Sequence, residues 1–399
     1  MSVNTMTFEQ SAAFLTDMYK EATGQYPTIQ IANTADFTTV ATTLMQGGVD
    51  PIIGALSQVL AKTVFSIRPY AQKFKDLNVD SQKWGAVVRK INYIDSDLDT
   101  TDERLNLVDG ASIDQYIVKK PKVIQTNFYG ATLYADHVTI FTDQLNSALN
   151  SADEFGRFLS GVFQNITDKL AQIREAEARQ ILANMIATKA GYDQTNAINV
   201  LQEYYNETGV TLTPANMFDP SNYQTFTRWL AAFMKTLTDK MSERSIKYHM
   251  NITGKELMRH TEPRFMRKYL SANVMNNIET LVNSNLYNPE YIRNITEGAE
   301  AVTYWQNIED PYTVDATPAY MDTTTGQVVD ALTDTKVENI IGVLFDVEAL
   351  GMTTMNTSVV NSPMNASGKY YNVFYHFEQK TWVDDTENFV LLYADTVAP

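Results

Sequence analysis

Residues 152–190 carry the longest helical pattern of the chain. Ser151 and Glu154 form a capping box at its start, Gly156 and Gly161 are the only breakers in its opening turns, and Gly191 is placed to end it. Such a helix would be about 57 Å long, well beyond the roughly 8–20 residues of ordinary globular helices. The pattern therefore predicts a spine rather than one element of a compact globule. Its apolar positions are Phe155, Phe158, Leu159, Val162, Phe163, Ile166, Leu170, Ile173, Leu182 and Met185.

Two strand patterns precede this helix, at Trp84–Ile94 and Val123–Ile140. The connection between them, residues 95–122, is far longer than the roughly 2–5 residues of a hairpin loop. Apolar side chains occupy both faces of the second pattern, and a two-stranded ribbon is at best marginally stable alone in water. The ribbon is therefore expected to be covered, either within its own subunit or by neighbouring subunits.

The long connection is polarised in charge, because it begins with carboxylates and ends with lysines. Opposite charges at the rim of an interface set register more than affinity, and tyrosine is enriched at interfaces because it combines a large ring with a polar tip. These residue types mark the ribbon as the candidate intersubunit surface. The candidate contact residues are Asp95, Asp97, Asp99, Asp102, Glu103, Lys119, Lys120, Lys122, Phe128, Tyr129 and Tyr134.

The remaining segments predict shorter elements around the spine. Near the N-terminus a capping box at Thr7 and a stop at Gly24 predict a helix, and Asp50-Pro51 predicts the start of another. Residues 195–355 read as a separate α+β unit. Its expected elements are a helix from Asp219-Pro220 to Met241, a strand at 246–252, a helix capped by Thr253, strands at 301–308 and 340–345, and a helical turn at 346–351. Beyond this unit, the chain is expected to end in two strands, at 370–383 and 387–393, joined by Asp384-Asp385.

Composition excludes several functional classes. The formal net charge is −16, from 31 basic and 47 acidic residues without a basic block, whereas a protein that grips phosphates needs clustered Lys and Arg. With no cysteine, disulfides, thiolate metal sites and cysteine nucleophiles are excluded. No secretory signal pattern opens the chain, and no apolar run approaches the roughly 18 residues that span a bilayer. We expect a soluble protein without a membrane partner.

No motif supports catalysis or a cofactor. His137, His249, His260 and His376 are widely spaced, and His137 and His376 fit structural positions in strands. The run that begins Asp95-Ser-Asp97 lacks the glycine and the glutamate of a calcium loop, so a solvated acidic loop explains it better. We expect no catalytic residue, no metal site and no cofactor. A charged helix face likewise explains Arg259, Arg264, Arg267 and Lys268 better than a phosphate site does.

The order of these elements resembles the major capsid proteins of tailed double-stranded DNA phages, which have the HK97-like fold, and is most similar to those of small podovirus-type phages. The C-terminal segments Ile340–Asp346, Tyr370–Tyr375 and Glu387–Leu392 also look like the end of such proteins. The resemblance implies an α+β HK97-like capsid fold. Its parts would be an N-terminal arm (1–50), an E-loop (84–140), a P-domain (51–83, 141–194 and 356–399, with the spine helix at 152–190) and an A-domain (195–355).

The resemblance also implies function. The subunit would form hexamers and pentamers of an icosahedral shell that encloses double-stranded DNA without sequence-specific binding. It would be made in the host cytoplasm, reside in the virion capsid, and work with a separate scaffolding protein and a portal. An encapsulin-type nanocompartment shell is the alternative, and its cargo would distinguish it. A carbohydrate-active enzyme, suggested only by acidity and aromatic content, and a monomeric surface-binding protein are more distant alternatives.

Overall fold

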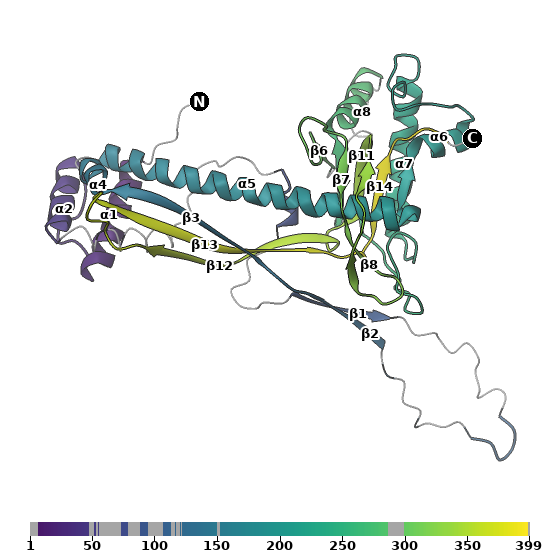
Figure 1. The fold of residues 1–399 in the computed structure, drawn as a ribbon, viewed down its shortest axis with the longest axis horizontal. Helices are drawn as coiled ribbons and strands as arrows, with labels where there is room; N and C mark the ends of the chain where they lie inside the picture. The colour runs from purple at the N-terminus through teal and green to yellow at the C-terminus, as the bar shows by residue number, and fades with distance from the viewer. Residues whose placement is uncertain are drawn as a thin grey trace. The chain divides into compact units, whose positions relative to one another are not determined.

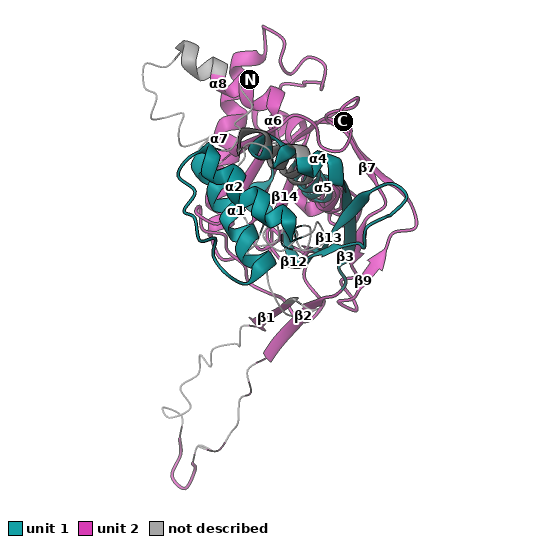
Figure 2. Cartoon of the chain, turned by 90° about the vertical axis from the view of Figure 1, so that its left-hand side faces the viewer, with its two compact units in different colours: residues 1–86, 130–177, 352–380 teal, residues 87–129, 178–351, 381–399 magenta. Residues whose placement is uncertain are grey.

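The computed structural model (Figure 1) describes residues 7–47, 52, 55, 73–78, 88–94, 107–112, 116, 120, 122–149, 152–285 and 299–397. The chain divides into two compact units, shown in Figure 2. Unit 1 comprises residues 1–86, 130–177 and 352–380, and unit 2 comprises residues 87–129, 178–351 and 381–399. The boundaries between units fall inside three long elements: α5 (Ala152–Tyr192), β12 (Leu350–Asn361) and β13 (Tyr370–Val383).

Two N-terminal helices belong to unit 1. Helix α1 (Phe8–Thr23) begins with the predicted capping box between Thr7 and Gln10, and Gly24 ends it in a left-handed conformation, as expected. Helix α2 (Thr34–Gln46), which the sequence analysis missed, begins at Asn33, whose side chain accepts a hydrogen bond from the Asp36 backbone N–H. The helix predicted after Asp50-Pro51 lies largely outside the described residues.

The core of unit 1 joins these helices to a three-stranded sheet of order β12-β13-β3. Phe155 of α5 is fully buried, and its ring lies 5.9 Å from that of Phe14 and 6.0 Å from that of Phe37. Tyr371 and Val373 of β13 complete the same buried cluster with residues of β3 (Thr132–Phe141) and α4 (Thr142–Ala148). The predicted apolar face of the long helix is thus confirmed at Phe155.

The single strand predicted at 123–140 is wrong. The chain forms β2 (Lys122–Phe128) and then β3, and between them Gly130 has a φ of 89°, a conformation that glycine adopts without steric cost. The two strands also have different partners. Strand β2 pairs with β1 (Val88–Ile94), whereas β3 pairs with β13 in a register that sets His137 opposite Phe374.

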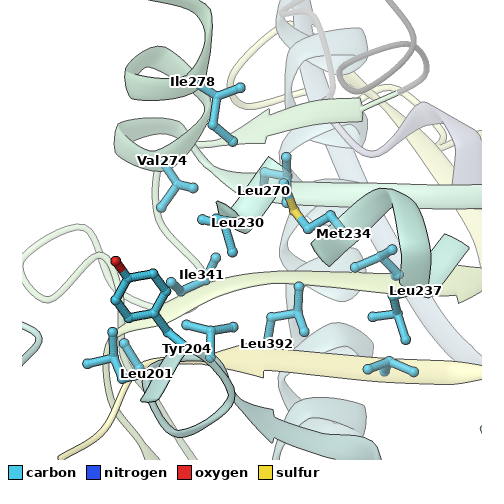
Figure 3. Close-up of a cluster of buried hydrophobic side chains, with 14 of the residues drawn as sticks. Leu201, Tyr204, Leu230, Met234, Leu237, Leu270, Val274, Ile278, Ile341 and Leu392 are labelled. Atoms are coloured by element: carbon cyan, nitrogen blue, oxygen red, sulfur yellow. The ribbon is translucent and has the colours of Figure 1, made fainter. Parts of the chain in front are cut away.

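Unit 2 is built on a five-stranded sheet of order β4-β14-β11-β5-β6, whose two outer pairs are parallel and whose inner pairs are antiparallel. Helices α6, α7 and α8 contribute a buried apolar cluster with side chains of this sheet (Figure 3). The bounds are β4 (Ala197–Asn199), α6 (Val200–Thr208), α7 (Tyr223–Ser242), β5 (Met266–Ser271), α8 (Ala272–Asn285), β6 (Ala299–Val302), β11 (Ile340–Asp346) and β14 (Phe389–Tyr393).

The spine helix is confirmed, although its end differs by one residue from the expected stop. Gly191 lies inside the helix, which continues to Tyr192. A Cβ at Gly191 would lie 2.9 Å from the Thr335 hydroxyl. Glycine therefore serves here to let another segment approach closely, rather than to reverse the chain.

The segment after α7 departs from its sequence pattern. The strand expected at 246–252 is wrong, because this stretch forms irregular backbone that is hydrogen-bonded to residues 384–389. Met250 N–H donates to the Asp385 carbonyl, and Phe389 N–H donates to the Tyr248 carbonyl. The helix expected after Thr253 is also wrong. Gly254 takes a φ of 74° and turns the chain so that Lys255 bridges back to Ile252.

After residue 300, the observed elements differ in part from the expected ones. Within 301–308 only residues 301–302 are strand, as part of β6. The helical turn expected at 346–351 is wrong, because only residues 347–349 form a turn, between the end of β11 at Asp346 and the start of β12 at Leu350. Strand β13 is confirmed over its full predicted length, but β13 and β14 pair in different sheets. Unit 2 also contains four short strands: β7 (Val314–Ala316), β8 (Ala319–Met321), β9 (Val328–Asp330) and β10 (Thr335–Val337). A 3-10 turn at Gln194–Asn196 lies in unit 2, and another at Lys75–Leu77 lies in unit 1. Among the described residues, no helix is long and apolar enough to cross a membrane.

Candidate intersubunit surface

The ribbon of β1 and β2 has two chemically different faces. Its antiparallel register sets Tyr93 opposite Val123 and Ile91 opposite Gln125, so these side chains share one face. On that face the exposed fractions of Ile91, Tyr93 and Val123 are 56%, 72% and 52%. Successive side chains of a strand point to opposite faces. On the other face, apart from the exposed Lys122 at the start of β2, the described side chains are buried or half-buried: Lys90, Asn92, Ile94, Ile124, Thr126 and Phe128.

Lys90 ties the second face of the ribbon to the turn that precedes β14. Its Nζ lies 2.9 Å from Oδ2 of Asp384 and 2.5 Å from Oε1 of Glu387. Arg259 adds a second cation, with its guanidinium 2.9 Å from the same oxygen of Glu387. The Asp384 and Glu387 side chains are only 2% and 7% exposed, so this cluster is screened little by salt.

The pKa values of this cluster follow from burial and charge together. Burial alone would lower the pKa of Lys90, but the carboxylates of Asp384 and Glu387 outweigh it and raise that pKa. Burial would raise the pKa of Asp384, but Lys90 and the bonds from Thr386 outweigh it and lower that pKa. For Glu387 burial prevails over both cations, and its pKa is raised. Lys90 and Asp384 are therefore the firmly ionised pair that attaches β1 of the ribbon to the turn before β14.

The structure places the predicted contact residues in different environments. Lys120, Lys122 and Tyr129 are exposed, with Tyr129 at 73%, whereas Phe128 is half-buried on the anchored face of the ribbon. Lys122 begins β2 opposite Ile94. The remaining charged candidates, Asp95, Asp97, Asp99, Asp102, Glu103 and Lys119, lie outside the described residues.

Tyr134 belongs to β3 in unit 1 and is not a residue of the β1–β2 ribbon. Its hydroxyl donates to Oε1 of Glu177 on α5 at 2.7 Å, and its ring stacks on Phe377 at 5.2 Å. Burial, followed by the neighbouring Glu177, raises the pKa of Tyr134 to about 12. These contacts are within the subunit, and a role for Tyr134 between subunits stays a prediction.

Sequence reasoning missed Ile91 and Tyr93, the exposed apolar residues of β1. The signal was present, since both alternate with Lys90, and the faces of a strand follow directly from alternation. What the sequence did not provide was the register with β2. That register sets Tyr93 beside Val123 and turns two scattered residues into one apolar surface.

In the part of the chain that the structure describes, no group of three or more His, Asp or Glu side chains comes together as a possible metal site. His249 is buried, with Nδ1 3.1 Å from Oδ1 of Asn388 and Nε2 2.8 Å from the Leu257 carbonyl, and burial lowers its pKa. It is a structural histidine, whereas His137 is exposed on β3.

The chain has the HK97-like capsid fold, as its likeness to solved phage capsid proteins shows. Over 84% of this chain and 87% of the other, it is similar to a chain in the capsid structure of Staphylococcus phage Andhra, with a TM-score of 0.53 and 11% identity. A chain in the structure of the head fiber and inner core protein gp22 of native bacteriophage P68 is also similar, with a TM-score of 0.52 and 9% identity over 83% and 87% of the two chains. At these identities the likeness establishes the fold alone.

Sequence comparison identifies the family. The family model described as "Phi29-like phage major capsid protein" matches residues 15–393. Comparison with curated proteins gives no match. Because the family match spans nearly the whole chain, the chain belongs to the Phi29-like phage major capsid protein family. It is a structural subunit of a phage capsid, and the resemblance seen in its sequence is confirmed.

Proposed function

We propose that this subunit assembles into hexamers and pentamers of an icosahedral shell around double-stranded DNA, with no catalytic role. Family membership supports the shell over a nanocompartment or an enzyme. A net charge of −16 is consistent with enclosing DNA without gripping it. The subunit would be made in the host cytoplasm and reside in the virion.

The observation that carries this proposal is the exposed face of the β1–β2 ribbon. Ile91, Tyr93 and Val123 are each more than half exposed, while the opposite face is held by Lys90. Contiguous exposed apolar side chains mark interaction sites, and burial of apolar area is worth about 25 cal/mol per Å². A sister subunit is the partner that a capsid protein meets in the highest number.

The parts of the subunit then have distinct tasks. Residues 84–140 would include the E-loop that lies across a neighbour, 195–355 would form the A-domain at the capsomer centre, and 1–50 would reach adjacent subunits as an arm. The P-domain would comprise 51–83, 141–194 and 356–399. A separate scaffolding protein would guide assembly, and a portal would occupy one vertex.

The test is a double substitution on the ribbon, Ile91→Ser with Tyr93→Ser. Both positions are exposed, so the subunit is expected to stay folded by circular dichroism but to form no shells when expressed with its phage's other head proteins. The matched control is Ile308→Ser with Leu332→Ser, at two exposed apolar positions of unit 2 outside the ribbon, and it should assemble. Normal shells from the double variant, seen by electron microscopy, would refute the proposed role of this face.

A deletion tests the long connection between β1 and β2. Deleting Asp97–Ser112 removes most of the acidic segment and leaves β1 and β2 intact. We expect a soluble, folded subunit that fails to form shells. Normal shells from the deletion variant would refute a role for this connection in assembly.

A further inference from the structure

A second exposed surface of unit 2 lies on a pair of bonded segments after α7. Ser245 and Arg259 exchange both backbone hydrogen bonds, each 2.8 Å long, in an antiparallel bridge. The side chain of Arg259 points inward, where its Nε donates to the Thr386 carbonyl at 3.1 Å and its guanidinium meets Glu387. Because neighbouring side chains on a strand alternate, the residues that flank this bridge point outward.

The outward residues combine apolar and cationic groups. Antiparallel pairing sets Ile246 opposite Met258 and Arg244 opposite His260. Ile246 and Met258 are 43% and 50% exposed, and Arg244, His260 and the adjacent Lys247 are exposed as well. We name these five residues the basic–apolar patch. Arg244 and Lys247 place two cations beside its apolar centre, and an apolar centre with a polar rim is the layout of an interaction surface.

One segment of this chain has the complementary chemistry. Residues 95–109 contain six carboxylates against the single cation of Arg104, and they also contain Leu98, Leu105, Leu107 and Val108. Where the structure describes this segment, Leu107 and Val108 are 45% and 73% exposed. The segment therefore offers anions and apolar side chains together, which is what the patch would bind.

We propose that the basic–apolar patch of one subunit binds the acidic segment 95–109 of a second copy of this chain. The proposal rests on the proposed shell function and adds the acceptor for the connecting loop. It makes the contact heterologous, with loop on one side and patch on the other, and contacts of that kind generate closed rings where the rotation between neighbours closes. Rim charges of this sort steer association and set register.

The test reverses the charge on each side separately. The patch variant is Lys247→Glu with His260→Glu, which changes the patch from two cations to a net charge of −1. The loop variant is Asp97→Lys, Asp99→Lys, Asp102→Lys and Glu103→Lys, which changes the segment 95–109 from a net charge of −5 to +3. Lys247 and His260 are exposed, and substitutions at exposed positions usually change stability little, so circular dichroism should show the patch variant folded. The matched control is Lys235→Glu, the same charge reversal at an exposed position of α7 outside the patch.

Each single-side variant should lower the yield of sedimenting shells by about tenfold or more, because it brings like charges together across the interface. The chain that carries both reversals should recover most of the wild-type yield. An equal mixture of patch-variant and loop-variant subunits should also recover ring-shaped capsomers, since each loop can then find a complementary patch on its neighbour. The control variant should assemble normally.

Several results would overturn the proposal. Normal shell yield from the patch variant would show that the patch does not bind the loop, and it would leave the proposed function intact. A wild-type protein that forms no shells would instead contradict the proposed function. Rescue by the doubly reversed chain without rescue by the mixture would show that the loop binds its own subunit. Normal shells that fail to retain DNA would assign the patch to nucleic acid and refute the loop contact.

Discussion

Replacing Lys90 by methionine should weaken unit 2 by removing the cation that holds the ribbon. Methionine keeps the length and the apolar stem of the side chain, so the change is mainly one of charge. Nζ of Lys90 lies within 2.9 Å of Asp384 and 2.5 Å of Glu387, whose carboxylates are almost fully buried. Removing one partner of a buried ion pair costs about 3–5 kcal/mol, since the other charge stays desolvated.

The lower end of that range applies to Lys90→Met. Arg259 still neutralises Glu387, and Asp384 keeps hydrogen bonds from the Thr386 backbone and hydroxyl at 3.0 and 2.6 Å. We therefore expect a loss of about 3 kcal/mol in the free energy of unfolding. For a unit of this length, about 2–4 °C of melting temperature corresponds to each kcal/mol, which gives a fall of about 6–12 °C.

Tryptophan fluorescence is a suitable assay, because Trp229, Trp305 and Trp382 all lie in unit 2. The matched control is Lys122→Met, the same substitution at an exposed position of the ribbon's other strand. It should leave the melting temperature within about 2 °C. Adding Asp384→Asn to Lys90→Met should restore part of the loss by removing the unpaired charge. If Lys90→Met melts like the control, the ion pairs contribute no net stability and the anchoring argument fails.

Three further substitutions examine the two units. Phe155→Ala should lower the stability of unit 1 by about 3–5 kcal/mol, because a fully buried ring that contacts Phe14 and Phe37 leaves a cavity; calorimetry checks this, and an unchanged transition would contradict it. Tyr134→Phe should cost about 1–3 kcal/mol by leaving buried Glu177 without its donor, whereas Tyr129→Phe, at an exposed residue, should cost nearly nothing. Gly351→Ala should destabilise unit 2 by at least about 1–3 kcal/mol, because its Cβ would lie 2.1 Å from the Trp382 ring; wild-type stability would show that the ring moves away freely.

Local patterns predicted the elements whose signal is strong along the chain. Helix α5 was predicted within two residues, because its apolar spacing runs through many turns, and β13 was predicted at its full length. Helix α2 was missed, although Phe37, Val40, Ala41 and Leu44 are all buried at helical spacing. Five threonines in that helix obscured the pattern, since β-branched residues lower helix propensity. The cap at Asn33 was the available signal.

Tertiary contacts explain the predictions that were wrong. Tyr248 and Met250 alternate as a strand would, but their backbones bond to the 384–389 turn rather than to a sheet ladder. Thr253 resembles a helix cap, yet its N–H donates to the Thr323 carbonyl and Gly254 turns the chain away. In both places the partner lies far away in sequence. No local pattern could have identified it.

The exposed face of the β1–β2 ribbon also depends on contacts between residues that are distant in sequence. Counting apolar residues suggested a ribbon with two apolar faces, which left open whether its own subunit or a neighbour covers it. The register and the position of Lys90 decide between these options face by face. The face of Lys90 and Asn92 is buried or half-buried, with Lys90 paired to Asp384 and Glu387 in unit 2, whereas the face of Tyr93 and Val123 is exposed. Because a one-residue shift in register would exchange these faces, the Lys90 ion pairs both stabilise the ribbon and select which residues it presents to another subunit.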